Sequence, residues 1–301
     1  MRWPRGGILA AFICAVLAAC GGTPEPPPDP DAVRDAEISS SLEMARFAFL
    51  SGRYDQAVQA YSGSLERAYA RDDVAAIAVA GQELAFSHLR GGKPKEAANV
   101  ASRTRGELAR RGRPARPALA LVEATARYRL NETTAAERLA REVAGASGDP
   151  MAAARATFLL GLIAADRRDL PALSAALDAL PQSNDQPEIR ADRLDLTGRL
   201  HMIRKEYQPA ADAFMVEEAL RRASGDEPGV ARALALAAEA TEKSGQEALA
   251  ADLWFRSGRS AAHEGDAQAV TRLRRAETLA RHTGQPALAN EARGLRLGLK
   301  S

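Results

Sequence analysis

The sequence predicts an all-α fold, a solenoid of about seven antiparallel helix-turn-helix repeats with a period near 39 residues. Three kinds of observation lead to this expectation. Short turns recur at that spacing, small residues stand at fixed offsets from each turn, and prolines fall at helix starts rather than inside helices. The composition agrees, because 46% of the 301 residues are hydrophobic but only 5% are aromatic, which suits closely packed helices.

The repeat is defined by seven turn positions that stand 37 to 40 residues apart: Gly52, Gly92, Asn131, Arg168, Lys205, Gly245 and Gly284. Five residues after the turns stand Ala57, Ala97, Ala136, Leu173, Ala210, Ala250 and Ala289. Seven residues before them stand Ala45, Ala85, Ala124, Gly161, Gly198, Ala238 and, as an exception, Glu277. A small residue on each helix lets two backbones cross closely, so each repeat is expected to be a helical hairpin.

Helix boundaries follow from prolines and capping residues. Asp149 followed by Pro150 predicts an N-cap and a first helical turn. Thr134 with Glu137 predicts a capping box. The expected domain therefore contains fourteen helices of about 14–20 residues. Glu277 breaks the pattern in the last repeat, where a polar residue is expected to face solvent at the end of the array.

One copy of the repeat resembles a known family. Residues 45–61, ARFAFLSGRYDQAVQAY, are similar to the tetratricopeptide repeat, with its small residue on the first helix, its Gly-x-Tyr turn, and its small and aromatic residues on the second helix. The resemblance extends over residues 33–300. The period exceeds the ~34 residues usual in that family, which implies helices longer by about one turn.

The resemblance also implies a binding surface, because the first helix of each tetratricopeptide repeat lines a concave groove. Carried over to this sequence, the groove is expected to present Arg46, Phe49, Phe86, Leu89, Arg90, Tyr128, Arg129, Arg199 and Met202. Aromatic and aliphatic groups beside arginine suit the anchoring of a protein partner. The alternative is that Phe49, Leu89 and Tyr128 pack between adjacent helices.

The N-terminus predicts export. Residues 1–19 combine a basic start at Arg2 and Arg5 with an apolar stretch too short to span a membrane. The segment Leu-Ala-Ala-Cys that ends at Cys20 resembles the lipobox of bacterial lipoprotein precursors. The resemblance implies that residues 1–19 are a cleaved signal peptide, that Cys20 is acylated, and that Gly21, in place of Asp, directs the protein to the outer membrane. An ordinary secretory signal that happens to contain a Cys is the alternative.

Residues 20–32 are predicted to be a tether. Five prolines between residues 21 and 30 favour an extended chain that reaches roughly 25–30 Å. The repeat domain is expected to occupy residues 33–301. Formal charge does not suggest a nucleic-acid partner, since 41 basic residues stand against 39 acidic ones.

Catalytic and metal-binding motifs were sought as an alternative to binding. None of the four histidines has a metal-ligand spacing, and no nucleophile elbow, phosphate loop or dinucleotide fingerprint occurs. Asp192 and Asp195 would share a helix face, but Asp195 also stands four residues before Arg199, which is typical of a surface ion pair. The sequence therefore predicts no enzyme, no cofactor and no metal site.

The leading hypothesis is a lipid-anchored, periplasm-facing scaffold that binds other envelope proteins, in a pilus or secretin, outer-membrane biogenesis or peptidoglycan assembly. A glycan- or small-molecule-binding surface lipoprotein is the alternative, although Trp254, the one Trp after the signal segment, falls at an expected core position. An enzyme of unfamiliar type is the third hypothesis.

Overall fold

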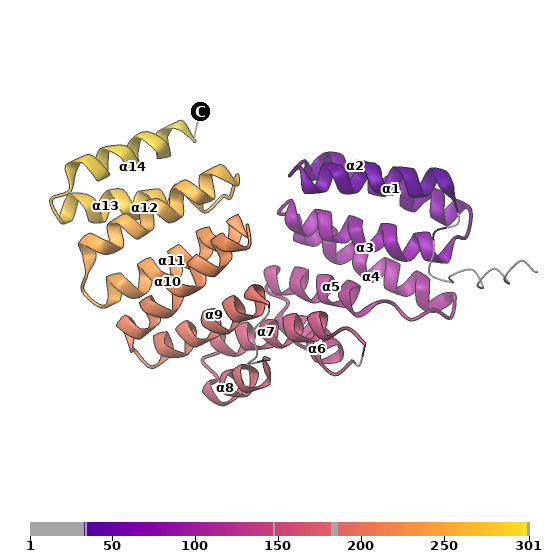
Figure 1. The fold of residues 1–301 in the computed structure, drawn as a ribbon, viewed down its shortest axis with the longest axis horizontal. Coiled ribbons are helices and arrows are strands. Elements are labelled where there is room, and N and C mark those ends of the chain that lie inside the picture. Colours follow the sequence, from indigo (N-terminus) through magenta and orange to yellow (C-terminus); the bar gives the residue numbers. More distant parts are fainter. Residues whose placement is uncertain (1–32, 34, 147, 182–185, 300–301) are drawn as a thin grey trace, which may run out of the picture. The chain divides into compact units, whose positions relative to one another are not determined.

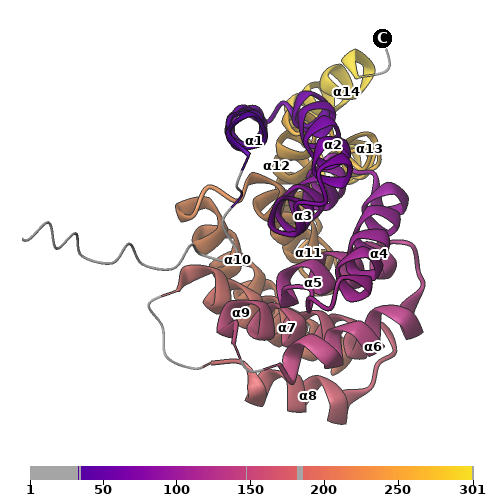
Figure 2. The same cartoon turned by 90° about the vertical axis from the view of Figure 1, so that its right-hand side faces the viewer.

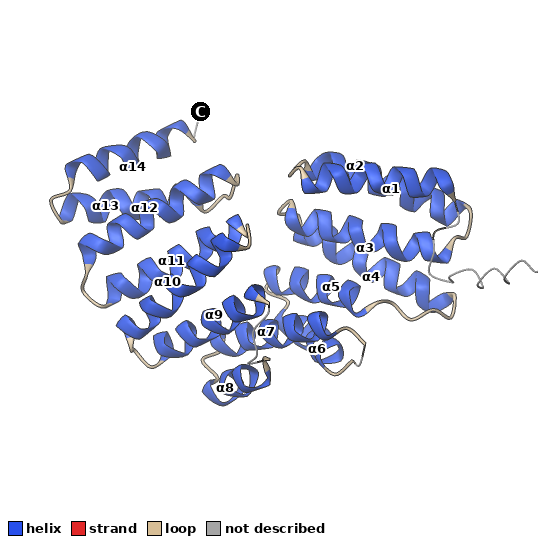
Figure 3. Cartoon of the chain, in the orientation of Figure 1, coloured by secondary structure: helices blue, strands red, loops and turns tan. Residues whose placement is uncertain are grey.

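The computed structural model describes residues 33, 35–146, 148–181 and 186–299. The helical unit spans Val33–Ser301. The predicted signal segment at 1–19 and the predicted lipid-bearing tether at 20–32 lie outside the described residues. Within the described residues every regular element is a helix and none is a strand, which confirms the predicted all-α class (Figure 3).

The described residues form fourteen helices, in seven consecutive pairs. The first four pairs are α1 (Ala36–Leu50) and α2 (Tyr54–Ala70), α3 (Val74–Arg90) and α4 (Pro94–Arg110), α5 (Pro117–Arg129) and α6 (Thr133–Ala144), α7 (Pro150–Asp166) and α8 (Leu170–Ala179). The last three pairs are α9 (Pro187–Ile203) and α10 (Tyr207–Ala223), α11 (Glu227–Lys243) and α12 (Glu247–His263), α13 (Ala269–His282) and α14 (Pro286–Gly298).

Each helix packs against the next along the chain, and the pairs follow one another as layers of a stack (Figure 1). The first helices of successive pairs, from α1 to α9, also contact one another. Most helices contain 17 residues, but α8 has only 10 and α6 only 12, both fewer than predicted. Leu180 precedes Pro181 and takes an extended conformation, as expected because a following proline disfavours helical geometry.

The turns have the geometry that the repeat pattern requires. All seven predicted turn residues have a left-handed backbone, with φ between 56° and 85°. The next residue donates its N–H to a carbonyl five residues earlier, as in Arg53 N to Ala48 O at 2.9 Å and Lys93 N to His88 O at 2.8 Å. This pattern ends a helix and satisfies its last carbonyls, so the turn position fixes where the following helix begins.

The small residues at the fixed offsets form the close helix crossings. All seven positions after the turns are buried, from Ala57 to Ala289. Gly198 illustrates how close the fit is, because an added Cβ would lie 2.4 Å from Cε1 of Phe214. The crossing of α9 and α10 therefore requires glycine at this position.

Two local predictions were wrong. The capping box of Thr134 and Glu137 does not form, because the left-handed Asn131 makes Glu132 the N-cap and α6 starts at Thr133. Glu277 does not face solvent: it is buried and pairs with Arg281 and with Arg296, whose Nη2 lies 2.9 Å from Oε2. Arginines from two helices make the burial of this carboxylate tolerable.

Candidate functional site

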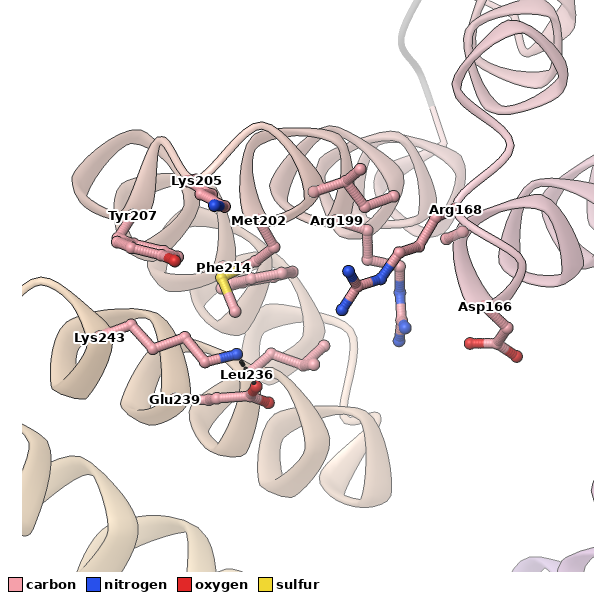
Figure 4. Close-up of a pocket in the computed structure, with 12 residues that line it drawn as sticks. Asp166, Arg168, Arg199, Met202, Lys205, Tyr207, Phe214, Leu236, Glu239 and Lys243 are labelled. Carbon is pink, nitrogen blue, oxygen red and sulfur yellow. Dashed lines mark hydrogen bonds and ion pairs between the residues drawn. The ribbon is translucent and has the colours of Figure 1, made fainter.

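A pocket of about 250 Å³ lies along the first helices of the fourth, fifth and sixth pairs (Figure 4). Helices α7, α9 and α11 supply most of its wall, and Tyr207 and Phe214 of α10 complete it. Arg199 and Met202, which the sequence assigned to the groove, lie six and three residues before the turn residue Lys205 and line this pocket. Seven lining residues in all stand six, three or two residues before a turn: Ala165, Asp166, Arg199, Met202, Ile203, Glu239 and Lys243. The predicted groove positions of three successive repeats therefore line one pocket.

Two cations at the edge of this pocket stand where other repeats have glycine. Arg168 and Lys205 are turn residues with φ of 56° and 63°, and both line the pocket. Four of the seven turns use glycine here, which takes this conformation without strain. Neither side chain has an ion-pair or hydrogen-bond partner within the described part of the chain. The two turns thus keep an unfavourable conformation together with an uncompensated positive charge.

The other charged groups of the pocket are already paired. Lys243 Nζ lies 2.6 Å from Glu239 Oε1, and the Tyr128 hydroxyl donates to Asp166 Oδ2 at 2.6 Å. Burial raises the pKa of Tyr128 above its usual range, with the Asp166 hydrogen bond as a second cause, so the hydroxyl remains a donor. Met202, Ile203 and Leu236 provide apolar wall. The pocket can therefore accept an anionic group at its edge and an apolar side chain inside.

Behind the pocket lies a buried ionic network. Asp192 of α9 accepts from Arg221 Nη2 of α10 at 2.6 Å and from Arg155 Nη1 of α7 at 2.8 Å. Arg199, which lines the pocket, pairs with Asp195. Asp192 and Asp195 are almost completely buried. Charges at such depth are tolerated only when hydrogen-bonded partners compensate them, and Arg199 connects this network to the pocket wall.

Glu217 is the member of the network with incomplete compensation. Its Oε1 accepts from Arg221 Nε at 3.2 Å, but its buried Oε2 has no hydrogen-bond partner among the described residues, and neither does Oδ2 of Asp195. Burial raises the pKa of Glu217 to about 8, and the charge of Asp195 contributes in the same direction. Glu217 is therefore mostly protonated at neutral pH.

The aspartates singled out by the sequence are paired but not on the surface. Asp195 pairs with Arg199, as the four-residue spacing predicted, yet the pair is largely buried. The surface interpretation was wrong because the partners of Asp192, Arg155 and Arg221, come from neighbouring helices. A local pattern carries no information about such contacts.

The predicted groove residues of the first three pairs lie in different environments. Arg46, Phe86, Arg90 and Arg129 are exposed, whereas Phe49 and Tyr128 are half-buried. Leu89 is buried, so its side chain packs between helices, as the alternative interpretation held. Phe49 stacks on Phe86 with ring centroids 5.3 Å apart, and Arg129 Nη1 donates to the Leu89 carbonyl at 2.8 Å. Partner binding by these residues stays a prediction.

The remaining features give little support to a metal site, a membrane span or a sugar-binding aromatic surface. Among the described residues, no group of three or more His, Cys, Asp or Glu side chains is arranged to hold a metal ion. No helix in this part of the chain is long and apolar enough to cross a membrane. Trp254 is half-buried and packs against buried apolar residues of the last helices, as its expected core position implies, and its Nε1 donates to Glu242 Oε2 at 3.1 Å.

Comparison with known proteins identifies the fold. No protein-family model matches the chain, and no curated protein matches it. A Rap protein complexed with Competence and Sporulation Factor superposes with a TM-score of 0.60 at 11% identity, covering 88% of this chain and 77% of its own. The apo form of RapI has a TM-score of 0.53 at 13% identity and covers 87% and 76%.

A tetratricopeptide repeat protein from Parabacteroides merdae has a TM-score of 0.50 at 14% identity, covering 86% of this chain and 99% of its own. Identities this low show a shared fold alone. Together with the seven turns of left-handed backbone, the likeness shows that this chain is a tetratricopeptide-like helical solenoid.

Proposed function

We propose that this protein is a lipid-anchored, periplasm-facing scaffold that binds a segment of another envelope protein in the pocket of α7, α9 and α11. The observation that carries the proposal is the pair of turn cations. Arg168 and Lys205 keep a left-handed conformation that glycine adopts at no steric cost, and both line the pocket. Strain retained at a surface cavity is characteristic of binding sites rather than of the fold.

The chemistry of the pocket indicates what the partner segment carries. Among the described residues, Arg168 and Lys205 are the two cations lining the pocket that have no ion-pair partner, so an acidic side chain or a carboxylate is the complementary group. Met202 and Leu236 favour an apolar residue next to it. The proposed ligand is therefore an extended protein segment with an acidic group beside an aliphatic or aromatic side chain.

The comparisons support binding as the type of function. The Rap protein, whose fold resembles this one, was solved in complex with Competence and Sporulation Factor. That a solenoid of this kind holds a binding partner in one solved complex makes a binding role for this pocket reasonable. The sequence contains no nucleophile elbow, phosphate loop or dinucleotide fingerprint that would favour an enzyme instead.

The envelope location rests on the N-terminal sequence. The lipobox-like segment ending at Cys20 and the residues after it motivate an outer-membrane anchor. Changing Cys20 to Ser is expected to leave the precursor uncut and to release the protein from the outer-membrane fraction. Changing Gly21 to Asp is expected to move it to the inner-membrane fraction. Unaltered fractionation of the Cys20→Ser chain contradicts the anchor and leaves the pocket hypothesis standing.

Site-specific photo-crosslinking in living cells tests the binding function. The full chain carries a photoreactive residue in place of Met202, inside the pocket, or in place of Val216, which is 51% exposed on α10 and does not line the pocket. We expect a protein adduct, identified by mass spectrometry, at position 202 and not at position 216. Absence of any protein adduct at position 202 contradicts the proposal.

A further inference from the structure

The first helix pair presents an apolar surface that the pocket function does not use. Leu50, Phe47 and Met44 are 76%, 66% and 64% exposed, which makes them the three most exposed large hydrophobic side chains among the described residues. All three lie on α1, within seven residues. Scattered apolar residues on a surface need no explanation, but a cluster of the most exposed ones indicates an interaction surface.

A depression lies directly beside this cluster. It measures about 630 Å³ and lies between α1 and α2, with Ala48, Gln56 and Ala60 contributing small or unbranched side chains. Met44 and Phe47 also line it. An exposed aromatic ring and a depression large enough for such a ring therefore occupy the same face of the first helix pair. The two helices that carry these residues, α1 and α2, lie side by side in Figure 2.

The same depression carries one acidic and one basic group. Glu43 and Arg53 both line it. Glu43 has no ion-pair partner within the described residues, and Arg53 makes only a cation–π contact, with its guanidinium 5.5 Å from the centre of the Phe47 ring. Both charges are therefore available to a molecule that covers this face.

We propose that the face formed by Glu43, Met44, Phe47, Leu50 and Arg53 binds a second copy of this chain. This surface carries an exposed ring beside a depression and an acid beside a base, so each feature has its complement on a second copy of the same surface. A two-fold axis places the Phe47 ring of each copy in the depression of the other and brings Glu43 of each copy to Arg53 of the other, twice. This inference is independent of the pocket, which lies on other helices.

Charge reversal with complementation tests the two-fold pairing. Two full-length chains with different tags are co-expressed, and their co-purification is measured. Glu43→Arg alone and Arg53→Glu alone are each expected to lower self-association at least ten-fold, because each places like charges together twice. Mixing the two variants is expected to restore association between them, since every contact then joins opposite charges.

The controls separate this outcome from misfolding and from other occupants. Reversal of two exposed residues of α14, Glu291→Arg and Arg293→Glu, is expected to leave co-purification unchanged. Phe47→Ala, at an exposed site, is expected to weaken association without lowering the melting temperature. Wild-type chains that do not associate overturn the proposal. It is equally overturned if the mixed variants fail to recover, since a membrane surface or a foreign protein on this face gives no complementation.

Discussion

The first two helix pairs, α1 to α4, and the fifth pair, α9 and α10, share the same repeat geometry but differ in the side chains that they bury. In the described residues, helices α1 to α4 bury no Asp, Glu, Lys, Arg or His side chain completely, and their interior is a largely apolar cluster that includes Ile38, Ile77 and Leu108. At α9 and α10 the buried set includes Asp192 and Arg221. The same repeat geometry is therefore compatible with a largely apolar interior and with one that also contains charged side chains.

The difference has a functional meaning. An ion pair in the interior contributes little net stability compared with apolar groups of the same volume. The network is nevertheless placed behind the pocket, and Arg199 belongs to both. Its buried charges fix the position of the pocket wall through directed hydrogen bonds, whereas the apolar interior of α1 to α4 has no directional contacts of this kind.

The largest expected effect comes from removing the centre of the network. Asp192→Ala leaves Arg221 buried without its main partner and is expected to cost about 3–5 kcal/mol of unfolding free energy. Chemical denaturation measures this change. Asp178→Ala, an exposed residue of α8, is the matched control and is expected to cost less than about 0.5 kcal/mol. Equal effects of the two changes contradict a structural role for the network.

A smaller effect is expected at a close helix crossing. Gly198→Ala places a methyl group against the Phe214 ring and is expected to cost about 1–3 kcal/mol. Gly106→Ala, at a helical glycine of α4 with only the end of the Arg110 side chain nearby, is expected to add up to about 1 kcal/mol of stability. Thermal melting of both variants checks the pair. A stabilising Gly198→Ala change shows that the crossing has room.

The raised pKa of Glu217 predicts a pH dependence of stability. Between its ordinary pKa of 4.5 and about 8, the folded protein holds a proton that the unfolded chain releases, so stability falls as pH rises through this window. Glu217→Gln is expected to remove most of that fall, about 3 kcal/mol between pH 5 and 8. Exposed Glu66→Gln serves as the control. An unchanged pH profile for Glu217→Gln shows that this carboxyl is not protonated in the folded state.

Sequence patterns predicted the repeat because its determinants are local. Each turn needs a residue tolerant of left-handed geometry, and each crossing needs a small side chain, so the positions from Gly52 to Gly284 could be aligned without a structure. The groove offsets also follow from the period, and Arg199 and Met202, which the sequence assigned to the groove, do line the pocket.

The sequence could not predict the buried network or the exact start of α6. Asp195 and Arg199 have the same spacing in a buried pair and in a surface pair, and only the packing of α10 decides between them. One signal was available, since Glu217 and Arg221 repeat the four-residue spacing one helix later. At α6 the left-handed Asn131 outweighs the capping preference of Thr134.

The central claim is that Arg168 and Lys205 remain in strained turns because they bind a partner. The most direct test replaces both with glycine, the residue of four other turns, and measures melting and partner capture on the same full-length chain. Relief of strain is expected to raise stability by about 1 kcal/mol per site, while the amount of partner crosslinked at position 202 falls at least ten-fold. Unchanged capture by this variant contradicts the claim, because the cations would then be dispensable for binding.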